Sequence, residues 1–223
     1  MFEEGQRLYG EQRFSEAAER WGRAALLQHA PSHAHASSML FDGRPGVAVD
    51  EKRAFEFASY GAALGCAHSK GALGRCYVGG CGVAKDAARG LALGRESEAA
   101  GSCFGQFVVG RCYNEGCGVA QDYAEALRLY GLAAAQGHAA AQFNLGVMFE
   151  TGQGVAQDYA EAVRLWRLAV AQGHAAAQYN LGWMIEKGKC VRKSKAEAVR
   201  LYRLAAAQGD ADASASLRRL GAA

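Results

Sequence analysis

Residues 139–174 read AAAQFNLGVMFETGQGVAQDYAEAVRLWRLAVAQGH, and this stretch decides the fold because its neighbours repeat it. Residues 103–138 and residues 175–210 align with it without a gap, so the sequence has a period of 36 residues. A period in this range is typical of stacked supersecondary units, each of which buries its apolar face only against its neighbours. The sequence therefore predicts one elongated all-α array and not a single globular core.

Each unit is expected to hold two helices joined by a glycine-containing loop. Apolar residues at helical spacing between Ala141 and Phe149 predict a first helix with one buried face. Gly146 lies inside that helix, where glycine is less favourable than alanine, so we expect it to permit close approach of the partner helix. Asp158 can accept hydrogen bonds from the first turn of the second helix, and Glu161 three residues later suggests a reciprocal capping box.

The repeat divides the chain into a shorter first unit, five full units and a terminal cap. The expected boundaries are 1–30 for the first unit, 31–66, 67–102, 103–138, 139–174 and 175–210 for the full units, and 211–223 for a capping helix. Pro31 marks the first junction, because proline ends the preceding helix there. Gly90 and Gly94 weaken the second helix of their unit, which we expect to be the least stable helix of the array.

Composition and charge exclude several classes of protein. The chain has 25 basic and 22 acidic residues and a net charge of +3, too small an imbalance to indicate a nucleic-acid partner. No stretch approaches the roughly 18 unbroken apolar residues of a membrane span, and the first residues, Met-Phe-Glu-Glu-Gly, lack the order of a secretory signal. We expect a soluble, cytoplasmic protein that neither binds nucleic acid nor inserts into a membrane.

Four of the seven cysteines recur with the repeat, and the other three, Cys66, Cys103 and Cys190, fall at unrelated repeat positions. Cys76 and Cys112 are 36 residues apart, as are Cys81 and Cys117, which favours reduced thiols packed as small apolar residues. The three histidines between residues 29 and 35 have no cysteine nearby, so we expect no metal site and no cofactor. The sequence contains no nucleophile motif and no phosphate loop, and we therefore expect no catalysis.

Three motifs recur across residues 31–210: Leu145-Gly146-x-x-Phe149, Gly152-x-Gly154-Val155-x-x-Asp158, and Ala162-x-x-x-Trp166-x-x-Ala169 followed by Gln172-Gly173. On these motifs the chain resembles the Sel1-like repeat family. The first unit resembles a tetratricopeptide repeat through Gly5, Ala17, Trp21 and Ala24. The resemblance implies an α-solenoid, a right-handed superhelix of antiparallel helix pairs whose first helices line a concave groove. Proteins of this kind usually act as adaptors that hold a peptide or protein in the groove.

If the first helices line a groove, the positions around the leucine of Leu-Gly point into it. Rings at these positions can act as binding anchors, although they can equally pack between adjacent helices. The arginines can pair with a carboxylate of a partner or lie on a solvated face, and the asparagines can bind a peptide backbone or join repeats. The predicted partner-binding residues are Arg75, Phe107, Arg111, Asn114, Phe143, Asn144, Tyr179, Asn180, Trp183 and Glu186.

The groove is expected to change character along the array. Arg75 and Arg111 make it basic in the third and fourth units, and the rings make it aromatic toward the C-terminal end. Trp183 is the strongest candidate for an anchor, because Val147 at the same repeat position shows that packing does not require a ring there.

The leading hypothesis is a non-catalytic scaffold that binds a protein or peptide partner. Because Met1 already lies inside a helical pattern with no leading cap, one alternative is a regulatory interaction module of a larger enzyme or ligase. A second alternative is a hydrolase like the cysteine-rich members of the family, which carry a disulfide in each repeat and have been linked to β-lactam binding. Only Cys103 and Cys112 approach the cysteine spacing that this resemblance implies.

Overall fold

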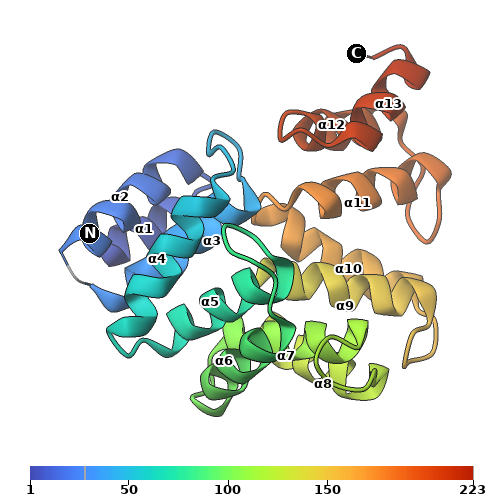
Figure 1. Ribbon diagram of the computed structural model, residues 1–223. Helices are drawn as coiled ribbons and strands as arrows, with labels where there is room; N and C mark the ends of the chain where they lie inside the picture. Colours follow the sequence, from blue (N-terminus) through green and yellow to red (C-terminus); the bar gives the residue numbers. More distant parts are fainter. Residues whose placement is uncertain (28, 223) are drawn as a thin grey trace.

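The computed structural model describes residues 1–27 and 29–222, and this part of the chain contains thirteen α-helices and no strand (Figure 1). The helices are α1 (Phe2–Gly10), α2 (Phe14–Leu26), α3 (Ala30–Asp42), α4 (Glu51–Ala63), α5 (Ala67–Gly79), α6 (Ala87–Ala99), α7 (Cys103–Glu115), α8 (Tyr123–Ala135), α9 (Ala139–Thr151), α10 (Tyr159–Ala171), α11 (Ala175–Lys187), α12 (Lys195–Ala206) and α13 (Ala211–Leu220). The predicted all-α solenoid is confirmed. None of the described helices is long and apolar enough to cross a membrane.

The stacked helix pairs curve until the beginning of the array meets its later part (Figure 1). Helix α5 contacts both α3 and α7 directly. Gly173, at the α10–α11 junction, packs against Phe14 of α2 and Pro45 of the α3–α4 loop, so that a methyl group at Gly173 would lie 2.8 Å from the Phe14 ring. The first ten helices therefore form a closed turn, from which α11, α12 and α13 extend.

At Gly110, Gly146 and Gly182, the glycine of the first helix lies under a ring from the second helix of the same unit. The Trp166 indole covers Gly146, where a methyl group would lie 2.5 Å from the indole Nε1. This Nε1 donates a hydrogen bond to the Phe143 carbonyl at 3.2 Å. Trp21 covers Gly5 in the first unit in the same way. The predicted close approach of the two helices at Gly146 is thereby confirmed.

The predicted helix caps are confirmed, but the capping box is only half formed. Asp158 Oδ1 accepts a hydrogen bond from the backbone N–H of Glu161 at 3.0 Å. The same cap is present at Asp50, Asp86, Asp122 and Ser194. The reciprocal bond from Glu161 was a wrong prediction, because the N–H of Asp158 donates to the Phe149 carbonyl at 2.9 Å. The Glu161 carboxylate pairs instead with Arg164 at 2.6 Å.

Pro31 and the glycines of α6 have other roles than the sequence suggested. Pro31 lies in the first turn of α3, where its missing N–H is not needed, and α2 has already ended at Leu26. The proline therefore begins one helix and does not end another. Helix α6 is complete despite Gly90 and Gly94. A methyl group at Gly90 would lie 2.7 Å from the carbonyl oxygen of Gly74, so glycine allows α6 to touch α5. The low stability of α6 stays a prediction.

Glutamine pairs join the two helices of a unit near the unit junctions. In each pair, Nε2 of the glutamine that follows the second helix donates to Oε1 of a glutamine in the first helix at 2.8 Å. The pairs are Gln136 with Gln106, Gln172 with Gln142, and Gln208 with Gln178. Gln172 Nε2 also donates to the Gly137 carbonyl of the preceding junction at 2.9 Å. The pairs therefore hold the two helices of a unit together, and the bond to Gly137 ties one unit to the preceding one.

Candidate functional site

One register relation governs the inner positions of successive units. The residue after Phe41 or after its equivalent in a later unit lies beside the residue two after the leucine of the next first helix. The two residues are 33 positions apart in the sequence. Asp42 with Arg75 and Glu186 with Arg219 follow this relation as ion pairs. The relation accounts for the surroundings of half of the predicted site residues, namely Arg75, Arg111, Asn114, Trp183 and Glu186.

Arg75, which we predicted to bind a carboxylate of a partner, is paired within the chain. Its Nη2 donates to Asp42 Oδ1, and its guanidinium carbon lies 3.6 Å from the centre of the Phe41 ring. Arg44 Nη2 donates to the other oxygen of Asp42 at 3.2 Å. Burial favours the neutral acid, but Arg75 and Arg44 outweigh it and hold the pKa of Asp42 well below its usual range. A partner could reach Arg75 only by displacing Asp42.

Arg111 and Asn114 lack the neighbour that the register relation would supply. Val78 occupies the position opposite Arg111, so Arg111 Nε donates to Glu115 Oε1 on its own helix at 2.7 Å. Val147 occupies the position opposite Asn114, whose Oδ1 is buried without a hydrogen-bond partner among the described residues. The Arg111 side chain remains 26% exposed and is accessible to a partner.

The rings of Phe107 and Phe143 pack against the histidines that cap the first helix of the following unit. Phe107 stacks on His138 with ring centroids 4.6 Å apart, and Phe143 stacks on His174 with centroids 4.8 Å apart. Each histidine Nδ1 accepts a hydrogen bond at 3.3 Å from a backbone N–H three residues later. Burial lowers the pKa of both histidines to about 3, so both are neutral near pH 7. One face of each phenylalanine is therefore already covered by the chain itself.

Asn144 and Asn180 occupy the same repeat position but have different surroundings. Asn144 lies beside the hydroxyl of Tyr130, which is a buried residue. Asn180 lines a hollow of about 150 Å³ together with Glu150 and Trp183. Glu150 and Trp183 are also 33 positions apart and follow the same register relation. Here the acid faces a tryptophan ring, whereas Asp42 and Glu186 each face an arginine. The hollow is open because no guanidinium fills it.

Two of the rings around this hollow, those of Tyr179 and Trp183, are half-buried, and a cation lies close to Trp183. Tyr179 lines the hollow beside Trp183. Lys189 Nζ lies 4.9 Å from the centre of the Trp183 ring and 5.1 Å from that of Tyr159, which is a cation–π arrangement. Burial raises the pKa of Glu150. The structure thus brings together three of the predicted residues, Tyr179, Asn180 and Trp183.

Glu186 is held by the terminal helix. Both of its carboxylate oxygens accept hydrogen bonds from Arg219 of α13, at 2.8 and 2.7 Å, and the Tyr202 hydroxyl donates to Oε2 at 2.8 Å. Arg219 is the main cause that lowers the pKa of Glu186 to about 2. The carboxylate that we predicted to face a partner therefore docks α13 against α11.

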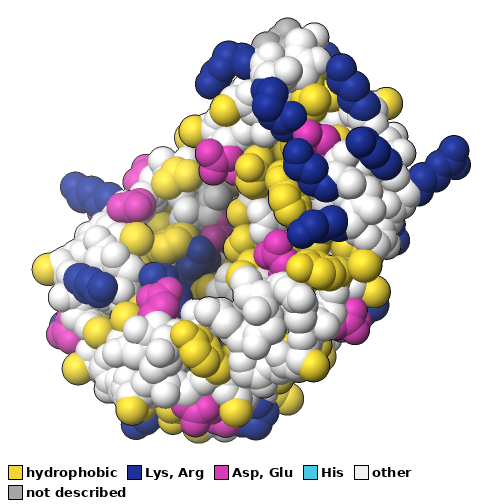
Figure 2. Space-filling view, turned by 90° about the vertical axis from the view of Figure 1, so that its right-hand side faces the viewer, with side chains coloured by type: hydrophobic (Ala, Val, Ile, Leu, Met, Phe, Trp, Pro, Cys, Tyr) yellow, Lys and Arg dark blue, Asp and Glu magenta, His cyan; other side chains and the backbone are white. Residues whose placement is uncertain are grey.

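A basic loop beside the hollow was missed by the sequence reasoning. The segment from Lys187 to Lys195 holds five basic and no acidic residues; it comprises the last residue of α11, the joining loop and the first residue of α12. Figure 2 looks onto this end of the molecule, and Lys and Arg side chains gather over its upper part with hydrophobic side chains between them. The sequence could have revealed this loop, because the equivalent loop of the preceding unit, between Thr151 and Asp158, carries no basic residue.

Each of the seven cysteines lies in the described part of the chain and carries a free thiol. Cys76 and Cys112 are fully buried. Burial raises the pKa of Cys103 and Cys112 to about 11, so both thiols are protonated near pH 7. The disulfides that the hydrolase alternative requires are therefore not supported by this structure.

Several solved structures are similar to this fold over most of the chain. A Sel1 repeat protein from Oxalobacter formigenes has a TM-score of 0.65 and 28% identity, and the alignment covers 100% of this chain and 93% of that one. A protective antigen of uropathogenic Escherichia coli has a TM-score of 0.60 and 27% identity, over 92% of this chain and 44% of that one. The immunity protein Pa5087 from Pseudomonas aeruginosa shares the fold, with a TM-score of 0.53 and 17% identity, over 93% of this chain and 83% of that one.

A comparison with curated proteins gave no match. The family model of the Sel1 repeat matches the chain five times, at residues 30–66, 69–102, 104–138, 139–174 and 175–210. These matches cover most of the chain and correspond to the five full units. The chain therefore belongs to the Sel1 repeat family.

Proposed function

We propose that this chain is a non-catalytic scaffold that binds an extended segment of a protein partner beside α11. The partner would contact the hollow between Glu150 and Trp183 and the basic loop from Lys187 to Lys195. The observation that carries the proposal is the register pair Glu150–Trp183. Within residues 1–27 and 29–222, no arginine pairs with this acid or covers this ring, unlike at Asp42 and Glu186. Membership of the Sel1 repeat family supports it, because these repeats generally mediate protein–protein interactions.

The chemistry of this face indicates what the partner presents. A half-buried tryptophan offers a large contact area at little cost in rotamer entropy, so it suits an apolar or aromatic anchor side chain. Asn180 can donate to and accept from a peptide backbone. The exposed positive charges of the loop attract acidic residues on the partner and raise the rate of encounter. We therefore propose a segment in which an apolar anchor is flanked by acidic residues.

Selection of peptides on the purified protein tests this proposal. A random peptide library is selected on the wild-type chain, and the enriched peptides are synthesised and titrated against variants. Trp183→Arg is the sharpest variant, because the same register position already holds an arginine in α5 and in α13, so this variant is expected to fold. The new guanidinium would pair with Glu150 and fill the hollow. We expect at least a tenfold loss of peptide affinity, as for a hot-spot residue.

A matched control and a second variant make the result decisive. Leu168→Ala removes an exposed apolar side chain from α10, away from the hollow, and is expected to leave peptide affinity unchanged. The double variant Trp183→Ala with Arg111→Ala tests the wider inner surface. If peptides enriched on the wild type bind this double variant and Trp183→Arg with unchanged affinity, the proposed binding face is wrong.

A further inference from the structure

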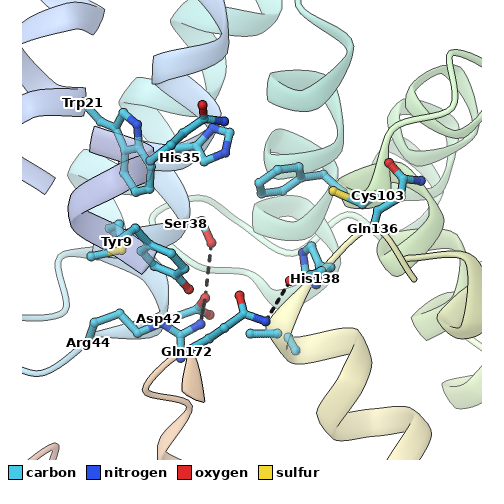
Figure 3. Close-up of a pocket in the computed structure, with 16 residues that line it drawn as sticks. Tyr9, Trp21, His35, Ser38, Asp42, Arg44, Cys103, Gln136, His138 and Gln172 are labelled. Atoms are coloured by element: carbon cyan, nitrogen blue, oxygen red, sulfur yellow. Dashed lines mark hydrogen bonds and ion pairs between the residues drawn. The ribbon is translucent and has the colours of Figure 1, made fainter. Parts of the chain in front are cut away.

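We propose that the closed turn of the solenoid holds a second site, which binds a small carboxylate with Arg44 as its counter-ion. The site is a cavity of about 260 Å³ between helices α1 to α3 on one side and the unit junctions before α7 and α9 on the other (Figure 3). It exists because the contact of Gly173 with Phe14 closes the turn. It is separate from the face at Trp183.

The charges around the cavity do not balance. Asp42 is the one carboxylate among the described residues that line it, and two guanidiniums, those of Arg44 and Arg75, pair with this single acid. The Arg44 side chain is only 4% exposed. His138, on the opposite wall, is neutral and adds no charge. One buried positive charge is therefore left over, and a buried charge without a partner is strongly unfavourable. An anion in the cavity would neutralise it.

Polar groups that can bind a carboxylate surround Arg44. Because His138 Nδ1 accepts a backbone hydrogen bond, the proton of the neutral ring lies on Nε2, which can donate. The hydroxyl of Tyr9 lies near Asp42 and Arg44 in Figure 3. Gln172 binds the opposite wall through Nε2, so its Oε1 is left as an acceptor for a donor group of the ligand.

The remaining walls are apolar or aromatic, and the volume limits the ligand. Trp21 and Phe104 line the cavity from opposite sides. A cavity of about 260 Å³ lies below the range of roughly 300–1,000 Å³ typical of drug-sized ligands, so it suits a small acid or one terminal residue of a peptide. The ligand class is therefore a carboxylate with a small flat or apolar body, either as a free acid or as the C-terminus of a peptide.

Benzoate, with benzamide as its neutral isostere, tests this site on the whole chain. At about 10 mM, a ligand with a dissociation constant near 1 mM raises the melting temperature of a chain this size by about 3–5 °C. We expect this rise with benzoate and none with benzamide. N-acetyl-diglycyl-phenylalanine and its C-terminal amide form the second arm. A response to the free peptide acid, but not to benzoate, would identify a peptide terminus as the ligand, whereas a response to benzoate would identify a free acid.

Two arginine variants separate the site from the fold. Arg44→Met leaves Asp42 and Arg75 as a balanced pair, so the free protein should melt at the same temperature or higher while affinity for the responding acid falls at least tenfold. Arg111→Met, which removes a paired arginine outside the cavity, should leave acid binding unchanged, as should Trp183→Ala. The proposal is overturned if neither acid shifts the melting temperature, if the amides bind as well as the acids, or if Arg44→Met binds as the wild type does.

Discussion

Replacement of Gly90 by alanine is expected to destabilise the protein, although alanine is the better helix former. In an unobstructed helix the change from glycine to alanine stabilises by about 0.5–1 kcal/mol. At Gly90, however, the added methyl group would lie 2.6 Å from Val78 Cγ2 and 2.7 Å from the Gly74 carbonyl oxygen. Both distances are well below ordinary van der Waals contact, which begins near 3.4 Å.

The size of the effect follows from what can move. A carbonyl oxygen in the middle of α5 cannot rotate away as a side chain can, so α5 and α6 must separate by several tenths of an ångström. Overpacking of this kind typically costs about 1–3 kcal/mol. We expect a net destabilisation of about 1 kcal/mol after the gain in helix propensity, which lowers the melting temperature of a chain this size by about 2–4 °C.

Gly131→Ala is the matched control, because Gly131 lies inside α8 with no atom within 4 Å of the added methyl group. It should raise the melting temperature by about 1–4 °C through helix propensity alone. Thermal unfolding of the three proteins, followed by circular dichroism at one protein concentration and one scan rate, gives both shifts. If Gly90→Ala is as stable as Gly131→Ala, then the close approach of α5 and α6 does not require glycine at position 90.

Three further predictions concern the last two units. Cys190 has a φ of +52°, where the equivalent position of the preceding unit is a glycine, so Cys190→Gly should stabilise the protein by about 1 kcal/mol in urea unfolding. Because the pKa of Glu186 falls from its ordinary 4.5 to about 2, its pairing with Arg219 stabilises above about pH 4.5 and is lost as the pH falls toward 2. The stability gap between wild type and Arg219→Ala should therefore close between about pH 5 and pH 2, and a gap that persists at the lower pH would contradict this reading. Gln142→Leu should cost about 1–3 kcal/mol, because Gln172 loses an acceptor at 2.8 Å, whereas an unchanged urea midpoint would show that the glutamine pairs are dispensable.

The helices and their caps could be predicted from the sequence because their causes are local. The apolar spacing around Leu145, the cap at Asp158 and the glycine at 146 each act within one unit, and repetition of the unit confirmed each pattern several times. The capping box was overpredicted because the same backbone N–H had a second acceptor, the Phe149 carbonyl, which only the folded loop brings near.

The surroundings of the candidate site could be predicted only in part, because they depend on pairs of units. When each first helix was considered alone, Arg75 and Glu186 were predicted to face the same open groove. Their partners, Asp42 and Arg219, lie 33 positions away, in the preceding and following units. Comparison of the sequence at that spacing would have shown acids opposite arginines in two units and Glu150 opposite Trp183 in a third.

The contact between Gly173 and Phe14 fixes the number of repeats. In an open solenoid each unit contacts only its neighbours, so units can be added or deleted with little consequence elsewhere. Here, deletion of a whole unit between α3 and α10 would pull the two ends of the closed turn out of register and remove the contact. A unit inserted after residue 210 would leave this contact in place, although it would move Arg219 away from Glu186. Duplication can therefore enlarge this protein at its C-terminal side, while the closed turn has a set number of units.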